Sequence, residues 1–124
     1  MSPVKILVID DEDSVRIPLM KLLSLEGYEV SGAVNGAEGL DAFKQLAPQV
    51  VVSDIRMPIF DGIEVLTRIM ESAPATIVIM ITGYGDDGFH DLVLKLGARD
   101  YFEKPVAYEE LLSAIKDELG SVDG

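Results

Sequence analysis

The sequence predicts an α/β domain in which a doubly wound, five-stranded parallel sheet is flanked by five helices. Three observations predict this fold class. Short, nearly continuous apolar runs alternate with longer runs whose apolar residues recur at helical spacing. Glycine, proline or aspartate separates many of these runs. Strands that are apolar throughout are typical of a parallel sheet that helices cover on both faces.

The five β-rich runs supply the strands, and each is followed by a helical run that forms the crossover to the next strand. The expected strands are residues 4–9, 28–34, 49–53, 76–81 and 99–103. The expected helices are residues 13–26, 37–47, 63–72, 89–96 and 107–119. Crossovers between parallel strands of one sheet are right-handed, so successive helices are expected to cover the two faces of the sheet.

An apolar stripe identifies the buried side of each helix. In the first helix the expected stripe is Val15, Leu19, Leu22 and Leu23, and Pro18 is expected at the end of the first turn, where a missing N–H does least harm. The stripes of the other helices are Ala37, Leu40, Phe43 and Ala47; Ile63, Leu66, Ile69 and Met70; Phe89, Leu92, Val93 and Leu96; and Tyr108, Leu111, Leu112, Ile115 and Leu119.

The length and composition indicate one domain with a soluble surface. The chain has 124 residues, and we expect residues 1–120 to form the domain and residues 121–124 to form a frayed tail or the start of a linker. A net charge of −12 disfavours direct contact with nucleic acid or anionic lipid. No apolar run approaches the roughly 20 residues of a membrane span. The absence of cysteine excludes disulfides and thiol chemistry and fits a cytoplasmic location.

Polar residues stand where the expected strands end, which is where open parallel sheets bind ligands. Asp10 and Asp11 follow the first strand, Asp54 the third, Thr82 the fourth and Lys104 the fifth. Neighbouring carboxylates cannot all ionise cheaply unless a cation joins them, and oxygen ligands favour Mg²⁺ or Mn²⁺. A lysine ammonium and a threonine hydroxyl are suitable partners for a phosphoryl oxygen, although the lysine could equally pair with a carboxylate.

Each of these residues also has an ordinary structural explanation. Asp10 and Asp11 precede a helix and could be N-capping residues, while Asp54 and Thr82 could be turn residues. Their joint placement at the ends of four strands favours a binding site, because a charged residue beside a buried strand needs compensation.

Five motifs occur in a fixed order along the chain. They are Ile-Leu-Val-Ile followed by Asp10 and Asp11, then Val-Val-Ser-Asp54-Ile-Arg-Met-Pro, Asp61-Gly62, Ile-Thr82-Gly, and Tyr101-Phe-Glu-Lys104-Pro105. With these motifs the sequence resembles the receiver domains of response regulators over about residues 3–119. The third and fourth strand motifs look like those of receivers that are attached to transcriptional output domains.

This resemblance implies specific roles for the site residues. Asp54 would be the phospho-acceptor, and Asp10, Asp11, Asp54 and the backbone carbonyl of Arg56 would hold Mg²⁺. Thr82 and Lys104 would contact the phosphoryl group, and Tyr101 would be the aromatic switch residue. The resemblance also implies a cis bond before Pro105 and the strand order 2-1-3-4-5.

The implied function is a signalling domain in a phosphorelay, which catalyses its own phosphorylation and dephosphorylation but is not otherwise an enzyme. A sensor histidine kinase or a phosphotransfer protein would donate the phosphoryl group from a phosphohistidine. The fourth helix, fifth strand and fifth helix would form the face that contacts an output domain or target, and phosphorylation could also produce a homodimer.

Three other protein classes share parts of this pattern. Aspartate-nucleophile phosphatases usually carry a second Asp two residues after the nucleophile, where this chain has Arg56. Flavodoxin-like electron carriers need a Ser/Thr/Gly-rich loop after the first strand, where this chain has the acidic residues 10–13. Pseudo-receivers usually lack an acidic-pair residue, the acceptor or the lysine, all of which are present here.

Three residues near the motifs have no settled role from sequence alone. Arg56 either governs the approach of water to the acyl phosphate or is a solvated side chain, and Tyr84 raises the same question. His90 is a lone histidine on the fourth expected helix, and no partner for it is predicted.

Overall fold

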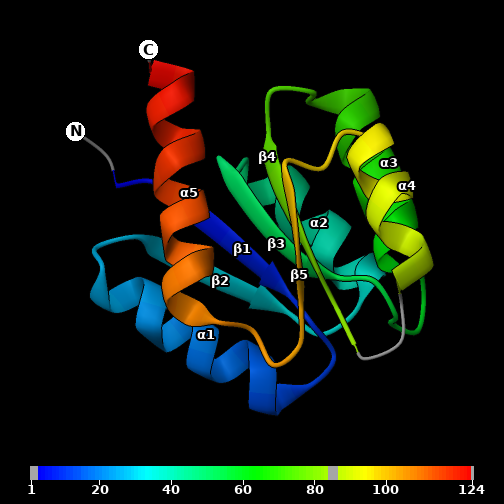
Figure 1. Ribbon diagram of the computed structural model, residues 1–124, viewed down its shortest axis with the longest axis horizontal. Helices are drawn as coiled ribbons and strands as arrows, with labels where there is room; N and C mark the ends of the chain where they lie inside the picture. Colours follow the sequence, from blue (N-terminus) through cyan, green and yellow to red (C-terminus); the bar gives the residue numbers. More distant parts are fainter. Residues whose placement is uncertain (1–2, 84–86, 124) are drawn as a thin grey trace.

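The computed structural model describes residues 3–83 and 87–123, and in these residues a parallel five-stranded sheet lies between two layers of helices (Figure 1). The strands are β1 (Lys5–Ile9), β2 (Glu29–Ala33), β3 (Val50–Asp54), β4 (Ile77–Thr82) and β5 (Asp100–Glu103). The helices are α1 (Asp13–Leu25), α2 (Gly36–Leu46), α3 (Gly62–Ser72), the short 3₁₀ helix η1 (Asp87–Phe89), α4 (His90–Lys95) and α5 (Tyr108–Asp123).

The strand order β2-β1-β3-β4-β5 confirms the predicted topology. All neighbouring strands pair in parallel, so their carboxyl ends meet at one edge of the sheet. The register aligns Ile9 with Ser53, and Asp54 with Ile81. Asp10 and Asp54 therefore lie at almost the same level at the ends of the neighbouring strands β1 and β3. The order of the strands changes direction between these two strands, because β2 lies on one side of β1 and β3 on the other.

Alternation along the strands divides the core into two layers. Leu7 and Ile9 point to the face covered by α2, α3 and α4, while Ile6 and Val8 point to the face covered by α1 and α5 (Figure 1). All four side chains are at most 1 % exposed. Burial of a side chain of this size contributes about 1.5–3 kcal/mol, so the strands that end at the site are held firmly in place.

Most residues of the predicted apolar stripes are buried or partly buried, but some residues at the edges of the stripes are not. Leu22 and Leu92 were expected to be buried but are 38 % and 41 % exposed, because they lie at the edge of the buried stripe. Ala47 is exposed rather than inward, since it is the left-handed residue, with φ 46°, that ends α2. Val65, which the predicted stripe of α3 omitted, is fully buried.

The place of Pro18 in α1 and the end of α5 also differ from the prediction. Because α1 begins at Asp13, Pro18 lies beyond the first turn and not at its end. Both Pro18 and Ser14, whose carbonyl would have accepted the missing hydrogen bond, are exposed, so water can satisfy that carbonyl. Helix α5 continues through Gly120 to Asp123, beyond its expected end at residue 119. None of the helices in the described part of the chain has the length and apolar character needed to cross a bilayer.

Candidate functional site

Four carboxylates converge at the carboxyl edge of the sheet. Asp10, Asp11, Glu12 and Asp54 each place a carboxylate oxygen within 4.8 Å of the others. Asp10 is fully buried and Asp54 is 3 % exposed, while Asp11 and Glu12 are exposed. Sequence reasoning identified three of these residues and missed Glu12 as part of the site. Its position directly after the Asp pair was the available signal.

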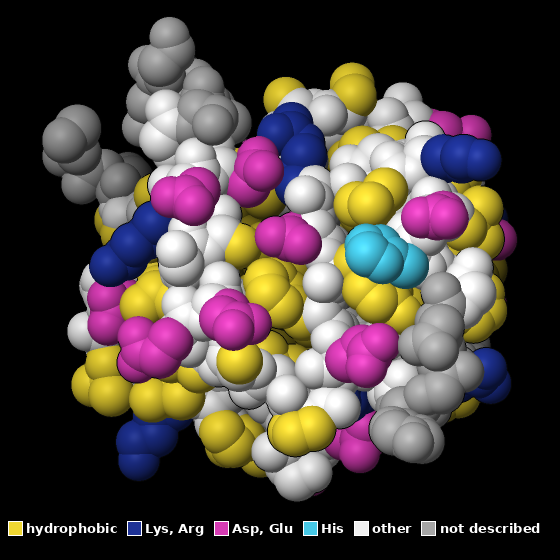
Figure 2. Space-filling view, viewed as in Figure 1, with side chains coloured by type: hydrophobic (Ala, Val, Ile, Leu, Met, Phe, Trp, Pro, Cys, Tyr) yellow, Lys and Arg dark blue, Asp and Glu magenta, His cyan; other side chains and the backbone are white. Residues whose placement is uncertain are grey.

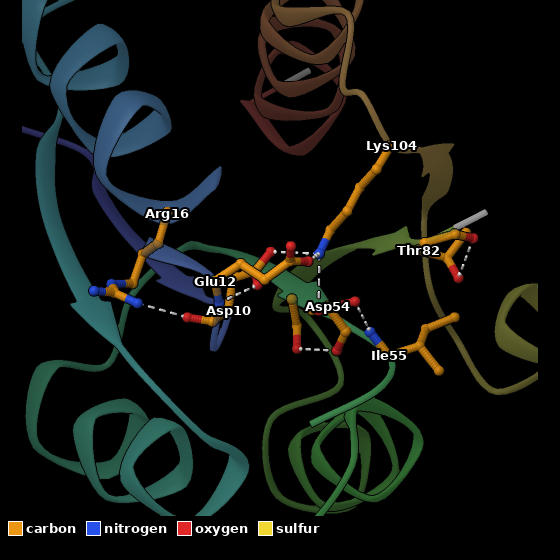
Figure 3. A network of polar contacts seen from close by, with 9 residues as sticks. Asp10, Glu12, Arg16, Asp54, Ile55, Thr82 and Lys104 are labelled. Carbon is orange, nitrogen blue, oxygen red and sulfur yellow. Dashed lines mark hydrogen bonds and ion pairs between the residues drawn. The ribbon is translucent and has the colours of Figure 1, made fainter. Parts of the chain in front are cut away.

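Lys104 brings a positive charge into this cluster from the loop after β5. Its Nζ lies 3.0 Å from Asp54 Oδ2, 3.1 Å from Asp10 Oδ2 and 2.5 Å from Glu12 Oε1 (Figure 3). Burial would lower the pKa of the ammonium, but its contacts with the carboxylates of Glu12, Asp54 and Asp10 together raise that pKa above its ordinary value. Lys104 therefore stays charged and bridges three carboxylates from two separate segments.

The Asp54 carboxylate is held between a backbone amide and Lys104. Its Oδ1 accepts a hydrogen bond from the Ile55 N–H at 2.8 Å, and its Oδ2 accepts one from Lys104 (Figure 3). Burial, assisted by the negative charge of Asp10, raises the pKa of Asp54 to about 6, although Lys104 and the Ile55 N–H oppose this. The ionised carboxylate is thus poorly compensated and would be stabilised by further positive charge.

Asp10 has one satisfied and one unsatisfied oxygen. Its Oδ1 accepts a hydrogen bond from the Glu12 N–H at 2.9 Å, and the guanidinium of Arg16 donates to its backbone carbonyl at 2.8 Å (Figure 3). Its Oδ2 is buried and accepts no hydrogen bond from the described residues, despite its closeness to Lys104. A buried carboxylate oxygen that lacks a hydrogen bond and has one ion pair with Lys104 could also bind a hard divalent cation, so these residues fit Mg²⁺ or Mn²⁺.

The alternative that Asp10 and Asp11 cap the following helix is wrong. The N-cap position of α1 belongs to Glu12, whose side chain makes no capping hydrogen bond. Asp10 instead closes a turn onto the Glu12 amide and directs its other oxygen toward Lys104.

The Asp61-Gly62 motif fixes the backbone that follows Asp54. The Asp61 side chain caps α3 by accepting a hydrogen bond from the Glu64 N–H at 3.0 Å. The Gly62 N–H donates to the Ile55 carbonyl at 2.6 Å. A Cβ atom at Gly62 would lie 2.0 Å from the backbone oxygen of Asp54, so only glycine allows this close approach.

Arg56 lies outside the carboxylate cluster. Its side chain is exposed, and its guanidinium carbon lies 6.0 Å from the centroid of the Phe89 ring in η1. This distance is at the limit of a cation–π contact, which links the loop after β3 to the start of α4. Tyr84, for which the same role was considered, lies outside the described residues.

Thr82 and Tyr101 lie on neighbouring strands beside the cluster. Thr82 is fully buried, and its hydroxyl makes a long, 3.5 Å contact as donor to the Gly83 carbonyl. Tyr101 is half-buried, and its ring stacks on His90, with centroids 4.6 Å apart and an interplanar angle of 7°. The expectation that His90 has no partner is therefore wrong, because the sequence does not show that the start of α4 lies against β5. The bond between Lys104 and Pro105 is cis, as the resemblance implied.

Comparison with known proteins assigns this arrangement to one family. The family model for the response regulator receiver domain matches residues 6–116. "Sporulation initiation phosphotransferase F" of Bacillus subtilis (strain 168) is 36 % identical over 115 residues, which cover 93 % of both chains. "Probable transcriptional regulator ycf27" of Porphyridium aerugineum is 42 % identical over 123 residues, which cover 99 % of this chain and 51 % of that protein.

Solved structures agree with these sequence relatives. The crystal structure of a response regulator receiver domain protein from Clostridium thermocellum superposes with a TM-score of 0.91 at 36 % identity, and the match covers 97 % of each chain. The chain spans about half the length of the first curated relatives it matches.

Proposed function

Because the chain belongs to the response regulator receiver domain family, we propose that it accepts a phosphoryl group on Asp54 from the phosphohistidine of a sensor histidine kinase or a phosphotransfer protein. The observation that carries this proposal is the Lys104 ammonium, 3.0 Å from a buried Asp54 carboxylate inside a cluster of acidic side chains. That arrangement joins a nucleophilic oxygen to a positive charge at the edge of the sheet where ligands bind.

The proposed reaction is an in-line phosphoryl transfer. A lone pair on an Asp54 carboxylate oxygen attacks phosphorus, so a P–O bond forms while the P–N bond of the donor breaks. The electron pair of the P–N bond returns to the imidazole of the donor, which leaves. Lys104 offsets negative charge on the phosphoryl oxygens throughout. A divalent cation held by Asp10, Asp11, Asp54 and the Arg56 carbonyl would supply further positive charge for the same purpose.

The acyl phosphate would act as a switch through Thr82 and Tyr101. The Thr82 hydroxyl makes a long contact with the Gly83 carbonyl, and a charged phosphoryl oxygen on Asp54 would be a stronger acceptor for it. Movement of Thr82 would leave room for Tyr101 to turn inward, and the new hydrogen bond would shift an existing conformational equilibrium.

The face formed by α4, β5 and α5 would carry this change to an output domain or a target protein. It contains Tyr101 and lies beside Thr82. Because the chain spans about half the length of its first relatives, an attached output domain belongs to this proposal. We also propose that phosphorylation produces a homodimer and that the protein is cytoplasmic.

Intact-mass spectrometry with a small-molecule phosphodonor tests the proposal. With Mg²⁺ present, the protein is expected to gain the mass of one phosphoryl group, and omission of Mg²⁺ should suppress the gain. Asp54→Asn should abolish the adduct, whereas Asp41→Asn, which changes an exposed carboxylate on α2, should keep it. No adduct on the parent protein with the small donor or with a phosphorylated histidine kinase would refute the proposal and favour a pseudo-receiver.

A further inference from the structure

A groove of about 410 Å³ lies between β5 and α5. Phe102 and Ala114 form its apolar floor, and both side chains are partly exposed. Because side chains alternate along a strand, Asp100 points to the same side of β5 as Phe102 and extends the groove. The groove therefore offers a strip of apolar surface on the output face. It lies on the side of β5 opposite to the one to which the switch residue Tyr101 points.

The walls of this groove are acidic. Asp100 contributes one carboxylate from β5, and Glu109, Glu110 and Asp117 contribute three from α5. The three α5 side chains are exposed. Figure 2 shows acidic side chains on both sides of an apolar patch between α5 and β5. Several like charges around one apolar strip favour a cationic partner and disfavour an anionic one.

Two basic side chains close to the groove, Arg99 and Lys116, pair with carboxylates outside it. Arg99 precedes β5 and pairs with Glu118 at 3.0 Å. Lys116 is the single basic residue in the α5 sequence, and its Nζ lies 3.4 Å from a carboxylate oxygen of Glu26, the residue that follows α1. Both cations are thus engaged by carboxylates that do not line the groove.

The charge pattern also argues against a second copy as the occupant. A two-fold symmetric dimer brings the same patch of both subunits together. If the groove formed the centre of such an interface, the acidic wall of one copy, with Glu109, Glu110 and Asp117, would face the acidic wall of the other. Like charges opposed across an interface cost free energy, so a partner of opposite charge is favoured.

We infer that the β5–α5 groove binds a cationic segment of the output partner, with a large apolar side chain on Phe102 and Ala114 and Lys or Arg side chains against the acidic walls. This inference rests on the proposed function, because it names the chemistry of the partner that the output face recognises. The apolar contact would supply affinity, and the surrounding charges would supply orientation and speed of association.

Three synthetic peptides provide the probes. The first is a fluorescein-labelled helical peptide with a stripe of Leu flanked by Lys, the second replaces each Lys with Glu, and the third replaces each Leu with Ser. Fluorescence anisotropy measures their affinity, and amide chemical shifts in NMR spectra locate the binding site. We expect the first peptide to bind and to shift the amides of Asp100, Phe102 and Ser113, and the other two to bind at least tenfold more weakly.

Matched charge reversals separate the groove from the overall negative charge. Glu110→Lys is expected to lower the affinity for the cationic peptide at least threefold, whereas Glu38→Lys should change that affinity less than twofold. Both residues are exposed acidic positions in the first turn of a helix, so the two reversals cost the helices similar stability. Circular dichroism confirms that each variant is folded. Equal weakening by both variants would show attraction to net charge alone and would overturn the inference.

The oligomeric state and the phosphoryl adduct are measured on the same samples. The peptides are titrated before and after treatment with the phosphodonor and Mg²⁺, and intact mass reports the adduct separately. If the adduct forms but no amide shifts occur in the groove, the inference fails while the proposed function stands. If the peptide binds the groove but no adduct forms, the proposed function fails instead. Light scattering reports whether the phosphorylated protein is a dimer. A phosphorylated dimer whose NMR amide shifts centre on the groove would also overturn the inference.

Discussion

The imidazole of His90 lies flat against the phenol ring of Tyr101, with ring centroids 4.6 Å apart. His90 is the first residue of α4 and Tyr101 lies in β5, so the stack joins two elements of the proposed output face. An aromatic pair of this kind contributes about 0.5–1.5 kcal/mol beyond its buried area. The stack is therefore large enough to bias the position of Tyr101 without fixing it.

His90→Ala should release Tyr101 toward its alternative position. Loss of about 0.5–1.5 kcal/mol corresponds to a change of roughly 2- to 12-fold in the ratio of the two positions. The ¹⁹F NMR spectrum of protein labelled with 3-fluorotyrosine would report this ratio. His90→Phe keeps a stacking partner and should stay close to the parent protein. An unchanged Tyr101 resonance in His90→Ala would show that the stack does not influence the switch.

Metal-free stability should depend on pH through Asp54. Its pKa is about 6 in the folded protein and 3.8 in the unfolded chain, so the folded state binds the proton more tightly. The contribution of this group to the free energy of unfolding is complete below pH 4 and is lost as the pH rises through 6. Asp54→Asn should remove this decrease in the free energy of unfolding. At pH 7–8 the metal-free variant should therefore be more stable than the parent by an amount on the order of 1–3 kcal/mol.

Urea denaturation from pH 4 to pH 8, with a chelator present, measures this difference. Other carboxylates also titrate in this window, so the quantity of interest is the parent curve minus the variant curve. Asp41→Asn, on the exposed side of α2, serves as the matched substitution and should follow the parent. A constant difference between the parent and Asp54→Asn across the range would contradict the prediction.

Divalent cations should stabilise the folded protein through the buried carboxylates. If Mg²⁺ binds the folded state alone, a free concentration of about 100 times Kd adds about 2.7 kcal/mol to the free energy of unfolding. Asp10→Asn should weaken this effect strongly, because it neutralises the carboxylate whose Oδ2 lacks a hydrogen bond. Thermal unfolding with and without MgCl₂ tests this, and an equal Mg²⁺ response in both proteins would exclude Asp10 from the metal site.

Gly62→Ala should destabilise the fold around the site. The new methyl group would lie 2.0 Å from the Asp54 backbone oxygen, and a rigid backbone cannot move aside cheaply. Overpacking usually costs about 1–3 kcal/mol, and we expect a loss at or above the upper end of that range. Gly120→Ala is the control, because its added methyl group meets no atom within 4 Å and its helix favours alanine. Urea denaturation that gives equal stabilities for the two variants would contradict the prediction.

The sequence alone determined the order and kind of the elements and the polar residues at the strand ends. These features depend on local patterns: apolar runs for β1, β3 and β4, helical spacing for α3 and α5, and Asp, Thr or Lys where a strand stops. The exposed positions of Leu22 and Leu92 were mistaken because helical spacing gives the direction of a stripe but not the width of surface that the sheet covers. The continuation of α5 through Gly120 was missed because glycine usually favours a helix end.

Only the tertiary structure decided which distant residues meet. The contact of Glu12 with Lys104 depends on the β1–α1 and β5–α5 loops, which lie 92 residues apart in the chain. The stack of His90 on Tyr101 depends on the packing of the start of α4 against β5. The raised pKa of Asp54 depends on burial between two neighbouring strands. Local sequence carries propensity and periodicity, whereas these contacts arise from strand register and helix packing, which bring separate segments together in space.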